Sequence, residues 1–141
     1  MKFDPKEYGI AARFRHWHGD QAEVHLGPFF FCKVEETIHT AFRVEKQHCN
    51  AHGSLHGGMM MAFSDYTLCL AANGGAQQSV ATVSCNNDFT APAFLGDIVY
   101  GKGEVIRRGR SLVFSRAELR VEDTVILISS GVIKLLPPAS S

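Results

Sequence analysis

The chain has 141 residues, with 14 acidic and 14 basic side chains, and 45% of its residues are hydrophobic. This length predicts one domain over residues 1–141, and the apolar content is enough for a core without metal or disulfide staples. The balanced charge argues against nucleic acid or an anionic membrane surface as the main partner.

The first stretch of the chain, residues 1–30, shows no sustained hydrophobic period. It is charged and is interrupted early by Pro5, so it lacks the apolar segment of a secretory signal peptide. Aromatic residues and turn formers such as Gly27 and Pro28 are scattered through it. We expect an N-terminal arm over 1–30 that contains a short helix and packs on the rest of the domain.

Two elements are predicted in the middle of the chain. Along residues 37–44 apolar and polar side chains alternate, a period of two that is typical of a strand with one apolar face. Residues 58–72 are rich in helix formers and apolar on nearly every side, which predicts a helix that is buried on most sides. The Asn-Gly-Gly run at 73–75 is a strong helix stop.

Four strand-like runs follow, at about 80–90, 97–107, 111–121 and 124–136. The connections between them are short, which implies that neighbouring strands are antiparallel. One strand, one buried helix and four further strands predict an α+β fold, in which a curled antiparallel sheet wraps one long helix.

The cysteines and the apolar segments indicate a soluble, cytoplasmic protein. The four cysteines are widely spaced in a chain large enough to fold unaided, so we expect no disulfide framework and a reducing compartment. The most apolar stretch, 125–136, contains Lys134 and is shorter than the roughly 20 residues that cross a bilayer.

Asp65 is the anomaly within the predicted helix. Its neighbours in the sequence include Met60, Phe63 and Leu68, and such surroundings disfavour the charged form of a carboxyl group by desolvation. Asp65 is therefore a candidate functional residue. The residues alone equally allow a side chain that is turned to solvent or paired with an arginine.

Gly57 and Gly58 stand at the start of the same helix. The first N–H groups of a helix have no intrahelical partner and lie at the positive end of its dipole, so these two can bind and polarise a carbonyl oxygen. Gly57 and Asp65 lie within about 80° of each other around the helix, so that a reacting group could meet both. This equipment suits hydrolysis of a thioester, because a thiolate leaves without a strong general acid.

A six-residue pattern, N-x-x-G-x-x-H-G-G-x(6)-D, runs into the predicted helix. Its members are Asn50, Gly53, His56, Gly57, Gly58 and Asp65. This pattern resembles the signature of hot-dog-fold thioesterases of the phenylacetate-degradation and mammalian acyl-CoA thioesterase type, and the match extends more loosely over about residues 35–136. The hot-dog fold of that family is also the arrangement that the predicted helix and strands favour.

The resemblance implies a role for each position. Asp65 would be the nucleophile or the general base for water, and the Gly57 N–H would bind the thioester oxygen. Asn50 would come from the other protomer to hold the water or the carbonyl, and His56 would help to fix the thioester and the loop. Thr82 would orient water, although β propensity explains a strand threonine equally well.

Two other groups of residues have competing interpretations. His48, His52 and His56 recur every four residues like a metal-binding face, but the intervening glycines break any continuous helix, and we expect no metal site. Three arginines flank the turn at Gly109, and such a cluster could bind the phosphates of coenzyme A or be a solvated turn. They are Arg107, Arg108 and Arg110.

The sequence thus predicts an acyl-CoA thioesterase without a cofactor. By resemblance, its active sites would form between paired subunits of a homodimer or of a dimer of dimers. One alternative is a hot-dog protein that binds acyl-CoA or an acyl-carrier protein without hydrolysis, against which the retained Asp65 argues. Another is a hot-dog hydratase or dehydratase, but no separate Asp–His motif is visible. The identity of the acyl group is not encoded in the fold.

Overall fold

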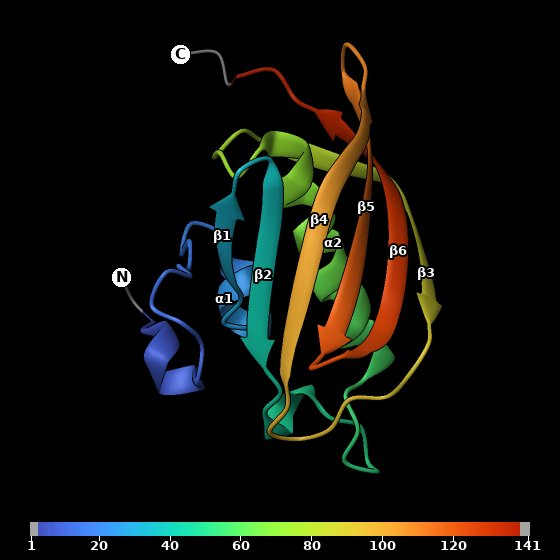
Figure 1. Cartoon of the computed structure of the whole chain (residues 1–141). Coiled ribbons are helices and arrows are strands. Elements are labelled where there is room, and N and C mark those ends of the chain that lie inside the picture. The colour runs from blue at the N-terminus through green and yellow to red at the C-terminus, as the bar shows by residue number, and fades with distance from the viewer. Residues whose placement is uncertain (1–2, 139–141) are drawn as a thin grey trace.

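The computed structural model describes residues 3–138 of the chain (Figure 1). The helices are η1 (Pro5–Tyr8), α1 (Gln21–Leu26), η2 (Lys46–His48) and α2 (Gly57–Asn73). The strands are β1 (Phe30–Val34), β2 (Thr37–Arg43), β3 (Val80–Phe89), β4 (Ile98–Arg108), β5 (Leu112–Val121) and β6 (Thr124–Leu135). The predicted long helix and the five predicted strands are confirmed to within a residue at each end, as is the α+β class.

All six strands form one antiparallel sheet in the order β1-β2-β4-β5-β6-β3. The sheet curves around α2, which lies against its inner face (Figure 1). Buried and exposed residues alternate along most of β5, as expected when one face of a sheet covers a helix and the other does not. β3 is the last strand and pairs only with β6, so its outer edge is open within the described chain.

α2 is fixed at both ends and lies close to the sheet. His56 is its N-cap, and Gly74 ends it in the left-handed conformation with φ of 67°, where glycine is unstrained. Gly103 on β4 allows the close approach, because a Cβ atom there would stand 2.9 Å from the Thr67 carbonyl oxygen. Among residues 3–138, no helix has the length and hydropathy of a membrane span.

β1 is the strand that the sequence pattern does not indicate. Its residues Phe30, Phe31 and Cys32 are all buried, so the alternation that reveals a strand is lost. The cause is the N-terminal arm, which covers the outer side of β1 with a cluster that contains Ile10 and Phe14. The packed arm and the short helix expected within 1–30 are therefore both present, and the arm hides the strand beside them.

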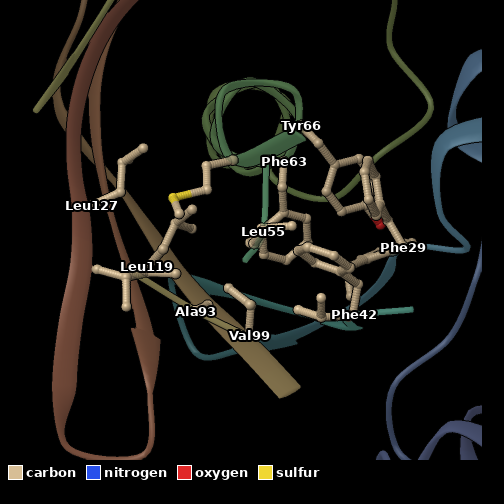
Figure 2. Close-up of a cluster of buried hydrophobic side chains, with 13 residues drawn as sticks. Phe29, Phe42, Leu55, Phe63, Tyr66, Ala93, Val99, Leu119 and Leu127 are labelled. Carbon is tan, nitrogen blue, oxygen red and sulfur yellow. The ribbon is translucent and has the colours of Figure 1, made fainter. Parts of the chain in front are cut away.

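The largest core cluster lies between α2 and the sheet (Figure 2). Phe29 packs edge-on against Phe42 and Phe63, with ring centroids 5.4 and 5.0 Å apart. The ring of Tyr66, on α2, lies 5.1 Å from that of Phe29, and the phenol oxygen of Tyr66 is on the Phe29 side (Figure 2). These aromatic contacts anchor the segment between α1 and β1 beside the middle of α2.

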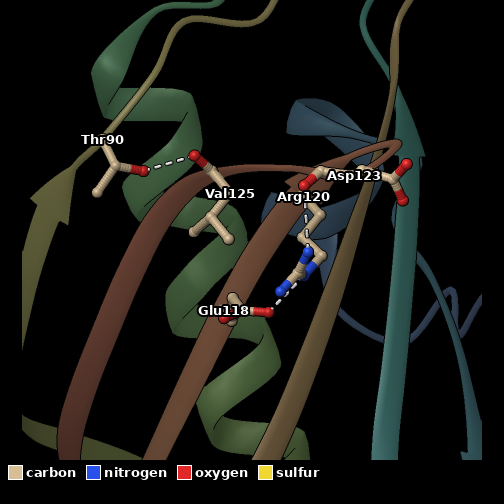
Figure 3. A network of polar contacts seen from close by, with 5 residues as sticks. All are labelled: Thr90, Glu118, Arg120, Asp123 and Val125. Carbon is tan, nitrogen blue, oxygen red and sulfur yellow. Dashed lines mark hydrogen bonds and ion pairs between the residues drawn. The ribbon is translucent and has the colours of Figure 1, made fainter.

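Polar contacts fix the turn between β5 and β6 and the end of β3 (Figure 3). Arg120 donates to Glu118 at 2.5 Å and to the carbonyl oxygen of Asp123 at 3.3 Å. Thr90, just after β3, donates to the carbonyl oxygen of Val125 at 2.6 Å. The ion pair is exposed and contributes little stability, about 0–1 kcal/mol, but the Thr90 bond holds the end of β3 to β6.

Candidate active site

Asp65 and Thr82 meet where α2 passes the edge strand β3. Asp65 is half-buried on α2, and Thr82 is exposed on β3. The Thr82 hydroxyl donates a hydrogen bond of 2.6 Å to Asp65 Oδ1. A register shift in the β3–β6 ladder between Thr82 and Ser84 coincides with this contact, and such bulges commonly re-aim a side chain. Two residues far apart in the sequence are thus brought together.

The Asp65 carboxylate has no basic partner in the described chain. Among residues 3–138 the salt bridges are two surface pairs, Arg116 with Glu104 and Arg120 with Glu118. The contacts of Asp65 with Thr82 and Cys69 both involve Oδ1, so among these residues Oδ2 has no donor. Among residues 3–138, the interpretation of Asp65 as half of an ion pair is therefore wrong.

Cys69 lies one turn further along α2, beside this pair. Its sulfur atom is 3.4 Å from Thr82 Oγ1 and 3.9 Å from Asp65 Oδ1. Burial, together with the negative charge of Asp65, raises the pKa of the Cys69 thiol to about 12. A thiol with this pKa is protonated at neutral pH, and the thiolate is the nucleophilic form, so Cys69 does not compete with Asp65 as an acyl acceptor.

At the start of α2, the two glycines differ in their free hydrogen-bonding capacity. His56 Nδ1 accepts the Gly58 N–H at 2.9 Å, so His56 caps the helix and occupies that donor. The Gly57 N–H has no acceptor among residues 3–138. Gly57 is therefore the better oxyanion donor of the two, and His56 positions it by holding the first turn of the helix.

Gly57 and Asp65 are too far apart to act on one carbonyl within one chain. They are eight residues apart on α2, and a rise of 1.5 Å per residue separates them by about 12 Å along the axis. Gly57 and Asp65 therefore lie on the same face of α2, but they do not contact each other. A site that uses both groups needs Gly57 from one chain and Asp65 from another.

Asn50 lies in the exposed loop before α2. Its side-chain oxygen accepts the backbone N–H groups of His52 and Ser54, and its amide nitrogen donates to Ser54 Oγ at 2.8 Å. These bonds shape the loop and leave one amide N–H of Asn50 for another partner. The loop in turn leads directly into the N-cap of α2.

The arginines at the β4–β5 turn are exposed and do not act as one unit. Arg108 donates to the carbonyl oxygen of Ala72 at 3.0 Å, near the C-terminal end of α2, where a cation is favourable. The side chains of Arg107 and Arg110 have no hydrogen bond or ion pair with the described residues. The structure therefore gives Arg108 a role in the fold and leaves the other two available.

The three histidines that recur every four residues do not converge. His48 is buried, accepts the Glu45 N–H through Nδ1 and bonds the Leu26 carbonyl oxygen through Nε2. His52 lies in an exposed loop, and His56 is the N-cap of α2. Within residues 3–138, no group of three or more His, Cys, Asp or Glu side chains is placed to hold a metal ion.

The part of the chain that carries this arrangement is similar to a known protein family. A family model described as the thioesterase superfamily matches residues 52–128, more than half of the chain, from the loop before α2 into β6. The chain belongs to the thioesterase superfamily. It is a hot-dog-fold thioester hydrolase, as the sequence predicts.

Individual relatives of this thioesterase agree with that assignment. A Pseudomonas aeruginosa protein whose name proposes an esterase is 31% identical over 114 residues, which are 78% of this chain and 84% of that protein. Human acyl-coenzyme A thioesterase 13 is 32% identical over 91 residues, 63% of this chain and 64% of the human protein. The E. coli PaaI protein, from the phenylacetic acid degradation operon, shares the fold with a TM-score of 0.77 at 20% identity, over 85% of this chain and 87% of that one.

A cavity of about 730 Å³ opens beside Asp65 in this thioesterase. Its wall is formed by the N-terminal arm, α1, the outward side of α2, the loop after α2 and the start of β3. Asp65, Cys69 and Thr82 line it, and so do Glu23 and Tyr66. The site that the signature indicates therefore continues into a pocket that the arm helps to close.

Glu23 belongs to this pocket and was not singled out from the sequence. Burial, together with the carboxylates of Asp20 and Asp65, raises its pKa to about 8. The sequence signal at this place is Asp20 followed three residues later by Glu23, which is typical of a helix N-terminus. Asp20 does cap α1 through its side chain, but Glu23 lines the cavity instead.

Proposed function

We propose that this thioesterase hydrolyses acyl-CoA thioesters at sites shared between two chains. The observation that carries the proposal is the Asp65–Thr82 pair at the wall of a cavity, together with a free Gly57 N–H that the same chain cannot bring to it. The choice of coenzyme A is supported by the relative named acyl-coenzyme A thioesterase 13. The arrangement favours hydrolysis over the non-catalytic alternative, because a carboxylate without a basic partner costs free energy and gives nothing to binding of an acyl chain.

In the proposed reaction the thioester oxygen accepts the Gly57 N–H of one chain. Asp65 of the other chain then either attacks the thioester carbon or removes a proton from the attacking water. The Thr82 hydroxyl donates to Asp65, so its oxygen can accept a hydrogen bond from that water and orient it. The carbon–sulfur bond breaks, and coenzyme A leaves as the thiolate, which takes up a proton from solvent. Where Asp65 is the nucleophile, water then hydrolyses the acyl–Asp65 anhydride, which releases the acid and restores the carboxylate.

We propose that the two chains pair through the open edge of β3. This strand is ten residues long, and an unpaired edge of that length is a template for a second strand. Val83 and Phe89 on β3 are large apolar residues, 59% and 51% exposed. Exposed Phe114 and Ile128 on β5 and β6 support a further pairing into a dimer of dimers through the outer sheet face.

A mixing experiment tests the shared site. We expect Asp65→Asn and Gly57→Pro each to be nearly inactive alone, and co-expressed chains to regain about one quarter of the parental rate. Half of the pairs are then hybrids, and one of the two sites in each hybrid combines an intact Gly57 with an intact Asp65. The measurement is thiol release from acyl-CoA by the co-expressed mixture, and differently tagged hybrids isolated by affinity purification should reach about one half of the parental rate.

Hybrids no more active than the separate variants would place both groups in one chain and contradict the proposal. So would a fully active monomer in sedimentation at the assay concentration. Tight binding of acyl-CoA by the parent protein without any thiol release would favour the non-catalytic alternative.

We further propose that Arg107 and Arg110 bind phosphates of coenzyme A. Replacing either with glutamine is expected to raise KM for acyl-CoA by about two- to fivefold, as for exposed charge pairs, and to leave KM for an acyl-pantetheine unchanged. Arg108→Gln is the matched control, because it loses the bond to Ala72 and should lower stability by about 1 kcal/mol. If the substitutions change KM equally for acyl-CoA and for the acyl-pantetheine, these arginines do not bind the phosphates and are only part of a solvated turn.

A further inference from the structure

The Cys69 thiol stands beside the Asp65–Thr82 pair and has no part in the reaction proposed above. Its sulfur atom lies 3.4 Å from Thr82 Oγ1 and 3.9 Å from Asp65 Oδ1, in the wall of the same cavity. Cys69 comes four residues after Asp65 on α2, so the two side chains are neighbours on one face of the helix. The thiol therefore meets both members of the pair that carries the proposed chemistry.

The direction of the hydrogen bond between Cys69 and Thr82 follows from the protons available. A threonine hydroxyl has one proton, and that of Thr82 is donated to Asp65 Oδ1 at 2.6 Å. In its contact with Cys69 the Thr82 oxygen is therefore the acceptor, and the thiol is the donor. Of the two acceptors within reach of the sulfur atom, the Thr82 oxygen is also the nearer one.

Cys69 holds the proton that this bond requires. Burial, together with the negative charges of Asp65 and Glu23, raises the pKa of the Cys69 thiol to about 12. At neutral pH the group is thus an uncharged thiol that can donate. A thiolate at this place would instead accept the Thr82 proton and withdraw it from Asp65, so only the neutral form supports the pair.

This bond limits what the Thr82 hydroxyl can do. Its oxygen has two lone pairs, and the thiol occupies one of them. The other remains for the water that Thr82 orients in the proposed reaction. Without the thiol both lone pairs are open, so the water has more than one position relative to Asp65, and part of the orientation needed for reaction is lost.

We propose that Cys69 is a positioning residue for the hydrolysis, which acts by donating its thiol proton to Thr82. The side chains of Cys69, Thr82 and Asp65 then form a chain of hydrogen bonds from thiol to hydroxyl to carboxylate. The effect of Cys69 on the reaction passes through the Thr82 oxygen. This inference rests on the proposed acyl-CoA hydrolysis and adds to it the residue that orients the Thr82 hydroxyl.

Two substitutions of Cys69 that differ from each other by one oxygen atom test the donation. Cys69→Ala removes the donor and is expected to lower kcat about three- to tenfold with little change in KM, the usual effect of one lost hydrogen bond. Cys69→Ser places a hydroxyl donor at the same position and should keep kcat within about twofold of the parental value. The measurement is thiol release over a range of acyl-CoA concentrations.

A combined variant shows whether the effect passes through Thr82. Thr82→Val keeps the branched shape of the side chain but has no hydroxyl, and it should lower kcat by about tenfold or more. In Cys69→Ala with Thr82→Val the loss should equal that of Thr82→Val alone, because the thiol then has no hydroxyl to orient. A residue that only packs would add its own loss in both backgrounds.

Cys85→Ala is the matched control for the loss of a thiol. Cys85 is also half-buried and also contacts a hydroxyl, that of Ser129 at 3.6 Å, but it is not among the residues that line the cavity. This variant should keep the parental kcat and KM. A loss of kcat in Cys85→Ala as large as in Cys69→Ala would make both losses a general effect of packing and overturn the proposal.

The remaining failures are distinguishable. Parental kcat in Cys69→Ala, or equal losses in Cys69→Ala and Cys69→Ser, would overturn the donation and leave the proposed hydrolysis standing. Additive losses in the combined variant would overturn it as well, because Cys69 would then act independently of Thr82. A folded parent protein that releases thiol from no acyl-CoA would overturn the proposed function and this inference with it.

Discussion

Asp65→Asn is expected to lower kcat for acyl-CoA hydrolysis by about 10³-fold or more while the fold and substrate binding persist. Asparagine keeps the volume of the side chain, and its carbonyl oxygen can still accept the hydrogen bond from Thr82. It can neither take a proton from water nor attack the thioester carbon. Colorimetric thiol release measures the chemistry, and thermal melting with and without acyl-CoA measures fold and binding.

The stability result carries as much information as the rate. If Asp65 were half of a buried ion pair, asparagine would strand its partner and cost about 3–5 kcal/mol. The described chain offers Asp65 no basic partner, so we expect only a small change in melting temperature. Asp123→Asn, an exposed change in the β5–β6 turn, is the matched control. Turnover near the parental rate in Asp65→Asn would remove this residue from the chemistry.

The elements whose residues follow one clear period could be predicted from sequence. β2 and the strands from β3 to β6 cover a helix with one face, so most of them alternate, and α2 ends at an unmistakable glycine run. β1 could not be predicted, because the arm buries its second face and removes the alternation. The arm lies on β1 through long-range contacts, which no local pattern along residues 1–30 encodes.

The candidate site divides in a similar way. The signature from Asn50 to Asp65 is contiguous, so its residues could be named in advance. The contact between Thr82 and Asp65 depends on where β3 passes α2, and the sequence left it undecided. The sequence also could not show which of Gly57 and Gly58 has a free N–H, because the two differ only in the hydrogen bond from the Gly58 N–H to His56 Nδ1. Glu23 could not be predicted as a site residue, because only the packing of α1 places it in the cavity wall.

Gly57→Pro is expected to lower kcat by about 10²–10³-fold, the usual cost of losing one oxyanion donor. Proline removes the Gly57 N–H, which has no acceptor among residues 3–138, and Gly57 is the first residue of α2, where proline is well tolerated. His56 has φ of −63° and ψ of 134°, a conformation that a residue before proline readily adopts. The helix should therefore persist while the donor is lost.

Gly57→Ala is the matched control, because it adds a side chain but keeps the N–H. Its Cβ atom would stand 3.4 Å from the ring of Phe89, an ordinary contact, so its kcat should remain within a few-fold of the parental value. Equal losses in both variants would point to crowding near Phe89 and not to a missing donor. A proline variant with parental kcat would show that the thioester oxygen is bound elsewhere. If only the proline variant loses activity and its melting temperature is unchanged, the N–H of Gly57 itself carries the effect.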